Sequence, residues 1–182
     1  LILFLSGMFF GFVGAEVTFG GWIYTYSLNM GLTNSQTAAY LSAVYWSAFT
    51  IARLTGIFLS SRIPARILMW VNLAGCFLSI AMVLMQPQSS GLLWVGTFAF
   101  GFFIATTFPV GMNLAERLGV ISVKVTRWFF IAASLATMLS PWIVGQFFES
   151  WSETILMWIV LGNIAISILF FGMIRRVQPR GR

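Results

Sequence analysis

One carboxylate stands out among the residues that could do chemistry. Glu16 lies in the stretch FVGAEVTFGGW, within an apolar run that begins at Leu1, and the chain has only four acidic residues. An ionised carboxylate inside a bilayer carries a large free-energy cost unless water, a cation or a hydrogen-bond donor accompanies it. We therefore expect Glu16 to face a cavity, where it binds a solute or takes up H⁺ or Na⁺ as a coupling ion. The alternative is a protonated or hydrogen-bonded contact between helices.

Groups for catalysis are scarce. The chain contains no histidine, no aspartate and one cysteine, Cys76. Nucleophile–histidine sites, Cys/His metal sites and carboxylate-bridged metal clusters therefore lack their parts. We predict that the protein is not an enzyme and has no cofactor or metal beyond a coupling ion, and that Cys76 is a small apolar packing residue.

The composition is that of an integral membrane protein. Hydrophobic residues make up 59% of the 182 residues and charged residues 8%, whereas soluble domains have about 25% charged residues. The apolar stretches are close to the roughly 20 residues that cross a bilayer as a helix. The whole chain, 1–182, is thus predicted to be one six-helix transmembrane unit, with helices near 1–28, 37–59, 67–86, 92–114, 128–148 and 155–174.

Nine of the ten basic residues are predicted to lie on one side of the membrane. They fall between the second and third spans, between the fourth and fifth, and in the C-terminal tail: Arg62, Arg66, Arg117, Lys124, Arg127, Arg175, Arg176, Arg180 and Arg182. The loops NMGLTNS, QPQSSG and ESWSET contain none. Because cytoplasmic loops carry an excess of Lys and Arg, both termini are predicted to be cytoplasmic. The net charge of +6 then reflects topology and lipid headgroups, and we expect no nucleic-acid partner.

Polar residues and a faint repeat divide the six spans into two triplets. Spans one, two, four and five carry most of the polar side chains and are expected to surround a wet cavity, whereas spans three and six are expected to be peripheral. MWVNLAGCFLSI in the third span resembles MWIVLGNIAISI in the sixth. If the repeat is real, an odd number of spans per unit inverts the second copy, as in many transporters. Chance similarity between apolar segments is the alternative.

Three motifs carry a resemblance to a known family. GAEVTFGGWIYTY, ARLTGIFLSSRIPARIL and FPVGMNLAERLG resemble the C-terminal six-helix half of a major facilitator transporter, in the sugar-permease branch that includes fucose permease and sodium-dependent glucose transporter-like proteins. SRIPAR is similar to the family's basic loop pattern D-R-x-G-x-R, with Ser61 and Pro64 in place of Asp and Gly. Phe108 likewise stands where the fucose permease has a tyrosine.

This resemblance implies a twelve-helix fold of the plasma membrane in which the halves rock to expose a central solute alternately to each side. The implied function is secondary transport of a monosaccharide or similar small solute, coupled to H⁺ or Na⁺. The implied partner is a missing N-terminal half or a second copy, and the start at Leu1 favours a fragment. The alternatives are a drug or metabolite efflux transporter, or a six-helix membrane scaffold with no transport activity.

A sugar site needs hydrogen-bonding groups for hydroxyls and flat apolar surfaces for the ring. The predicted binding residues meet these needs from spans one, two, four and five: Glu16, Trp22, Tyr26, Tyr45, Trp46, Thr106, Asn113 and Thr137. Glu16 is also the predicted coupling residue. For each aromatic residue, packing against the core or lipid is the alternative.

Other residues are predicted to shape or gate the helices. Gly20 and Gly21 could let span one bend, and Pro109 and Pro141 are expected to interrupt spans four and five. Arg53, Arg62 and Arg66 are expected to brace the inner gate, as the resemblance implies for this region. Gly7 and Gly11 form a G-x-x-x-G spacing that predicts tight helix contact.

Overall fold

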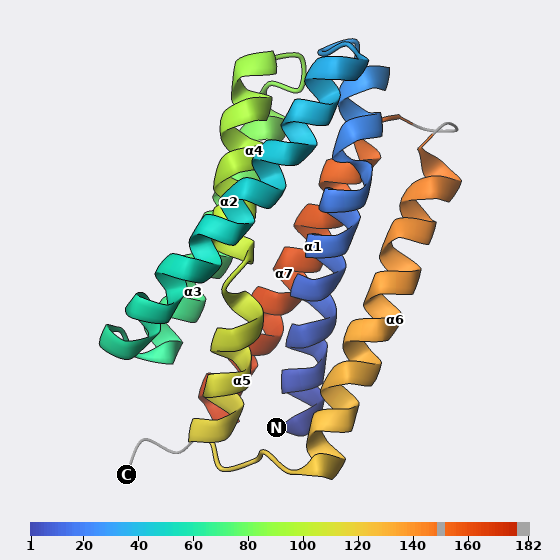
Figure 1. Ribbon diagram of the computed structural model, residues 1–182. Coiled ribbons are helices and arrows are strands. Elements are labelled where there is room, and N and C mark those ends of the chain that lie inside the picture. The colour runs from blue at the N-terminus through green and yellow to red at the C-terminus, as the bar shows by residue number, and fades with distance from the viewer. Residues whose placement is uncertain (149–151, 178–182) are drawn as a thin grey trace.

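The chain is an all-helical bundle (Figure 1). The computed structural model describes residues 1–148 and 152–177, with side chains up to residue 174. Within these residues it contains no strand. Its seven helices are α1 (Ile2–Asn29), α2 (Ser35–Arg62), α3 (Ala65–Met85), α4 (Ser90–Ile104), α5 (Thr107–Arg117), α6 (Val123–Phe147) and α7 (Ile155–Val177).

These seven helices give six candidate membrane spans in the described residues, because α4 and α5 together form one span, Ser90–Arg117. The predicted fold class, an all-α membrane protein with six long apolar helices, is confirmed. Helix α6 begins five residues earlier than the expected position 128. Its cap explains the difference, since Ser122 Oγ accepts a hydrogen bond from the backbone N–H of Val125 at 3.3 Å.

The turns between helices follow from cap and glycine chemistry. Helix α2 starts with a reciprocal capping box, in which Asn34 Oδ1 accepts from the Thr37 N–H and Thr37 Oγ1 accepts from the Asn34 N–H, both at 2.9 Å. Helices α1 and α5 are each followed by a glycine at φ +67°, Gly31 and Gly119. This left-handed conformation closes a helix and favours glycine.

The helices of the two triplets of spans pack against one another. Helix α1 packs mainly against α7 and α6, whereas α4 packs mainly against α2 and α3. The first span of each triplet therefore lies against the second and third spans of the other triplet. Two similar three-helix units in opposite orientation are expected to pack in this way.

The closest helix contact is between α1 and α7. A Cβ added at Gly11 would lie 2.4 Å from the backbone oxygen of Asn163, and one added at Gly7 would lie 2.5 Å from the ring of Phe170. Ser167 Oγ also donates a hydrogen bond to the Met8 carbonyl at 2.9 Å. The G-x-x-x-G spacing of Gly7 and Gly11 thus marks close helix packing, as its sequence indicated.

Burial within the chain differs from the expectation that spans three and six are the peripheral ones. In an apolar 18-residue stretch of each helix, 28% of the residues are buried in α2 and in α6, against 50% in α3 and 39% in α7. Both α3 and α7 hold buried polar residues, namely Asn72, Asn163 and Ser167. The least covered helices of the chain are therefore α2 and α6.

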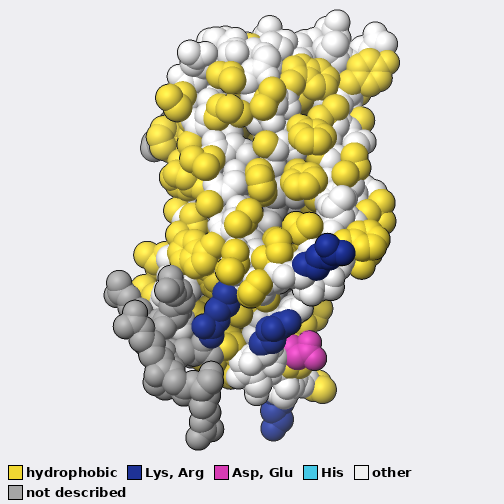
Figure 2. Space-filling model, turned by 90° about the vertical axis from the view of Figure 1, so that its left-hand side faces the viewer, with side chains coloured by type: hydrophobic (Ala, Val, Ile, Leu, Met, Phe, Trp, Pro, Cys, Tyr) yellow, Lys and Arg dark blue, Asp and Glu magenta, His cyan; other side chains and the backbone are white. Residues whose placement is uncertain are grey.

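The basic residues of the described loops gather at one end of the bundle. The α2–α3 turn and the α5–α6 loop both lie toward the end at which the N-terminus begins (Figure 1). Figure 2 shows apolar side chains over most of one face and Lys and Arg side chains only toward one end. Arg180 and Arg182 lie outside the described residues, as do the side chains of Arg175 and Arg176.

Candidate functional site

The fourth span is broken near its middle. Helix α4 ends at Ile104, and α5 begins at Thr107. The sequence explains the break because Pro109 has no N–H and cannot bond the carbonyl of Ala105, four residues earlier. Inside a bilayer such a freed carbonyl needs another donor.

Side chains from two other helices reach this break. Arg53 of α2 directs its Nε–H to the Ala105 carbonyl, with a donor–acceptor distance of 3.4 Å. Asn72 of α3 donates from Nδ2 to Thr106 Oγ1 at 2.7 Å in a buried bond. Within the span, Thr107 Oγ1 donates to the Ile104 carbonyl at 2.5 Å. Side chains of α2, of α3 and of the span itself therefore form hydrogen bonds at this irregular segment.

Pro141 does not interrupt α6, which contradicts the expected break in span five. Helix α6 runs without interruption from Val123 to Phe147 with Pro141 inside it. A single proline removes one helical hydrogen bond, and packing in a membrane bundle can absorb that loss. The neighbouring Ser140 is buried and bonded to the Asn163 amide of α7, whose Nδ2 donates to Ser140 Oγ at 3.2 Å.

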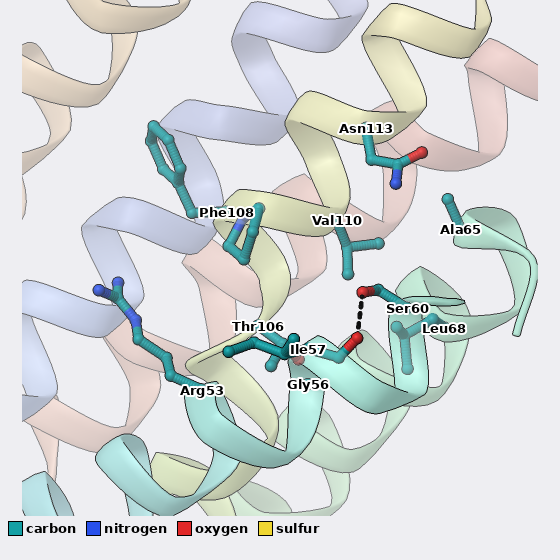
Figure 3. A pocket seen from close by; sticks show the side chains of 11 residues that line it. Arg53, Gly56, Ile57, Ser60, Ala65, Leu68, Thr106, Phe108, Val110 and Asn113 are labelled. Atoms are coloured by element: carbon teal, nitrogen blue, oxygen red, sulfur yellow. Dashed lines mark hydrogen bonds between the residues drawn. The ribbon is translucent and has the colours of Figure 1, made fainter. Parts of the chain in front are cut away.

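A crevice of about 450 Å³ opens beside the break, between α2, α5 and the start of α3 (Figure 3). Its lining combines hydrogen-bonding side chains with apolar walls. The polar lining residues are Arg53, Ser60, Thr106 and Asn113, and the apolar ones include Ile57, Leu68, Phe108 and Val110. This mixture suits a small polar molecule that also has an apolar surface.

Glu16 is not one of the residues that line the crevice. Its side chain is partly buried. Tyr45 Oη donates a hydrogen bond to the Glu16 backbone carbonyl at 3.0 Å, which ties α2 to α1 at this level. A role of the Glu16 carboxylate in binding or coupling stays a prediction.

The structure brings two of the eight predicted binding residues into the crevice. Thr106 and Asn113 line it, although each already has a partner, because Thr106 accepts from Asn72 and Asn113 Oδ1 accepts from Arg117 Nε at 2.7 Å. Binding of a solute by these residues stays a prediction.

The other predicted binding residues lie elsewhere. Tyr45 is fully buried against Phe19 and Phe100, and Trp46 is 48% exposed, with its ring next to Gly20 of α1. The remaining three residues lie on α1 and α6 and do not line the crevice. Trp22 packs on Phe148, Tyr26 is fully buried, and Thr137 Oγ1 donates to the Ser134 carbonyl of its own helix at 2.8 Å. Their roles in binding also stay predictions.

The predicted gating glycines and arginines occupy different environments. A Cβ at Gly20 would come within 2.7 Å of the Tyr45 ring, whereas Gly21 faces open space. Gly20 thus allows close packing of α1 on α2. Arg62 and Arg66 are exposed at the end of α2 and the start of α3. A gating role for these four residues stays a prediction.

Asn72 is a residue at the break that was not predicted from the sequence. It lies in a span expected to be peripheral, yet it is 3% exposed and holds Thr106 at the break. An amide in the middle of an otherwise apolar stretch was the available signal, because buried amides in membrane helices pair with another polar group.

Replacing Asn72 with leucine should therefore destabilise the protein. Loss of the bond to Thr106 is expected to cost about 1 kcal/mol, which should lower the apparent melting temperature in detergent. Ser79→Ala is the matched control, because Ser79 is buried in the same helix and bonds only its own backbone, at Gly75. An equal change in both variants would mean that the Asn72–Thr106 bond does not stabilise the break.

The site and fold define a class: a six-helix membrane bundle with a polar crevice at a broken span. Comparison with curated proteins is consistent with this class. The chain is 30% identical over 94% of its length to sodium-dependent glucose transporter 1 of Xenopus laevis. It is 31% identical over 93% of its length to the human protein of that name. It is also 33% identical over 82% of its length to major facilitator superfamily domain-containing protein 4A of Danio rerio.

The chain is thus homologous to members of the major facilitator superfamily, and the resemblance indicated by its motifs is confirmed. Its six apolar helices fit half of such a transporter. It covers 35%, 33% and 28% of these three relatives, about a third of their length. No family model matches the chain, and no solved structure does so.

Proposed function

We propose that the chain forms half of a secondary transporter that moves a monosaccharide or similar small solute across the membrane by alternating access. The observation that carries this proposal is the crevice at the broken fourth span, which combines hydrogen-bonding side chains with apolar walls. The names of the relatives support a role in transport of a sugar or small solute rather than in catalysis.

The crevice has the chemistry for a sugar. Its volume of about 450 Å³ lies within the roughly 300–1,000 Å³ of small-molecule sites. Asn113, Thr106 and Ser60 can exchange hydrogen bonds with hydroxyl groups, and Phe108 offers a flat apolar face to the C–H side of a sugar ring. Glu16 is the proposed coupling residue, where H⁺ or Na⁺ would neutralise the carboxylate.

A second six-helix unit would complete this transporter. Helices α2 and α6 have surfaces with exposed polar residues at positions within their spans, namely Trp46, Ser47, Thr50, Arg53, Thr55, Ser134 and Trp142. Polar side chains inside a bilayer turn toward protein or water. An N-terminal six-helix half, or a second copy of this chain, would cover these faces and enclose the path. The basic end would face the cytoplasm of a plasma-membrane protein.

Uptake by the purified full-length protein in liposomes tests the proposal. With labelled glucose outside, we expect saturable accumulation that requires an inward Na⁺ or H⁺ gradient and stops when an ionophore collapses that gradient. Unlabelled monosaccharides should compete, whereas hydrophobic drugs should not. Competition only by drugs would favour efflux, and no saturable flux under any gradient would contradict the proposed function.

A further inference from the structure

An open groove of about 740 Å³ lies at the start of α6, and no residue lines both this groove and the crevice at the broken span. Four of its lining side chains are apolar: Ile121, Val123, Phe130 and Ile131. Among the described lining residues only Arg127 is charged. We propose that the groove binds an anionic phospholipid, with an acyl chain along the apolar wall and the phosphate group at Arg127.

The apolar wall is long enough for part of an acyl chain. From Val123 to Ile131 the helix rises about 12 Å at 1.5 Å per residue. The side chains of Val123, Phe130 and Ile131 are 74%, 54% and 47% exposed. Phe130 also packs against Phe108, with ring centroids 6.1 Å apart, which holds one side of the wall in place. An acyl chain can pack along this wall, whereas a soluble anion cannot use it.

The phosphate end of the proposed site is positively charged. Arg127 and Lys124 lie in the first turns of α6, and both are exposed. Neither forms an ion pair with another side chain that the structure describes. A guanidinium can bind two phosphate oxygens at once. Ser122 Oγ accepts a hydrogen bond from the Val125 N–H, so its own hydroxyl hydrogen can donate to the lipid.

The groove lies at the level where lipid headgroups are expected. Helix α6 begins at the end of the bundle where the basic loops gather (Figure 1). Trp128 follows Arg127 and is 58% exposed, and an exposed tryptophan near the end of a span favours the headgroup region. Basic residues at this level attract anionic lipids. Position, charge and apolar wall therefore match the two parts of an anionic phospholipid.

The groove ends before the α6 residues that the proposed function assigns to the contact with a second six-helix unit. Ser134 is the first of these residues, and it follows Ile131 by three positions. The lipid and the second unit would thus occupy successive turns of α6. The experiment uses the full-length protein, because a second unit that extended further along α6 would close the groove.

Native mass spectrometry of the purified full-length protein measures lipid binding and needs no transport. The protein is titrated with dioleoylphosphatidylglycerol or dioleoylphosphatidylcholine, with and without inorganic phosphate as competitor. The variants are Arg127→Gln, which removes the charge, and Ile131→Trp, which fills the groove. Arg62→Gln and Leu78→Trp are the matched controls, because both residues are exposed and lie outside the groove lining.

We expect phosphatidylglycerol to bind roughly fivefold more tightly than phosphatidylcholine, the effect of about one basic side chain at an anionic headgroup. Arg127→Gln should abolish this preference, and Arg62→Gln should keep it. Ile131→Trp should lose tight binding of both lipids, and Leu78→Trp should retain it. The preference compares two lipids within one variant, so a lower amount of folded protein does not change it.

Equal binding of the two lipids by the unmodified protein would overturn the proposal, as would an unchanged preference in Arg127→Gln. Displacement of the lipid by inorganic phosphate alone would show that the groove binds a soluble anion, which also contradicts it. Equal binding by Ile131→Trp and Leu78→Trp would place the acyl chain outside the groove and refute the site.

Discussion

Glu16→Gln in the full-length protein is expected to abolish ion-driven accumulation of the solute. Glutamine has nearly the same shape and can still hydrogen-bond, but it cannot exchange a proton or carry the negative charge that attracts Na⁺. Equilibrating exchange of solute should continue, because Glu16 does not line the crevice. Uptake into liposomes with and without an ion gradient measures the difference, and we expect a loss of at least about tenfold in gradient-driven accumulation, the equivalent of about 1.4 kcal/mol.

Glu116→Gln is the control for this variant. Glu116 is exposed at the end of α5, outside the crevice lining, so its loss should leave accumulation within a factor of two of the unmodified protein, as a rough bound for exposed charges. Unchanged accumulation and unchanged ion dependence in Glu16→Gln would exclude Glu16 as the coupling residue. The carboxylate would then be a structural contact between α1 and its neighbours.

Gly11→Val is expected to prevent stable folding. A Cβ at position 11 would lie 2.4 Å from the Asn163 backbone oxygen and 2.3 Å from Ser167 Oγ, and a backbone atom cannot move aside as a flexible side chain can. Valine adds two further methyl groups in the same place. Overpacking of this kind costs about 1–3 kcal/mol or more. Size-exclusion chromatography of detergent extracts should show aggregated protein in place of a monodisperse peak.

Gly162→Ala separates this steric effect from the general cost of changing a glycine in these helices. Gly162 lies in α7, one residue before Asn163, and a Cβ there meets no atom within 4 Å. Its variant should elute as the unmodified protein does. A normal elution profile for Gly11→Val would show that α1 and α7 do not pack as closely as described.

Periodicity and composition were sufficient to predict the membrane class, because six apolar stretches of bilayer length admit few other structures. The break in span four was also readable, since Pro109 removes a hydrogen bond at a fixed distance along the helix. The same rule predicted a break at Pro141, where α6 is continuous. The rule identifies which carbonyl is freed, but packing decides whether the helix separates there.

The direction in which side chains point was harder to predict. Tyr45 and Trp46 are adjacent in sequence, and both met the chemical needs of a sugar site. The first is fully buried, whereas the second is 48% exposed. Neighbours on a helix point about 100° apart, so residue type alone could not assign them to one cavity. Asn72 was missed for a related reason, because its partner Thr106 lies on a different span.

Thiol labelling of the crevice tests most directly the claim that a solute passes beside the broken span. Cys76 is fully buried, so it should contribute little labelling, and cysteines outside this chain would be replaced. Ser60→Cys places a thiol in the crevice, and Leu78→Cys places one on the apolar outer face of α3. We predict that a charged, water-soluble thiol reagent labels position 60 at least about tenfold faster than position 78, because thiolates form and react in water. We also predict that excess monosaccharide slows labelling at position 60 and leaves labelling at position 78 unchanged. Equal rates at both positions, or no protection by any solute, would contradict the claim.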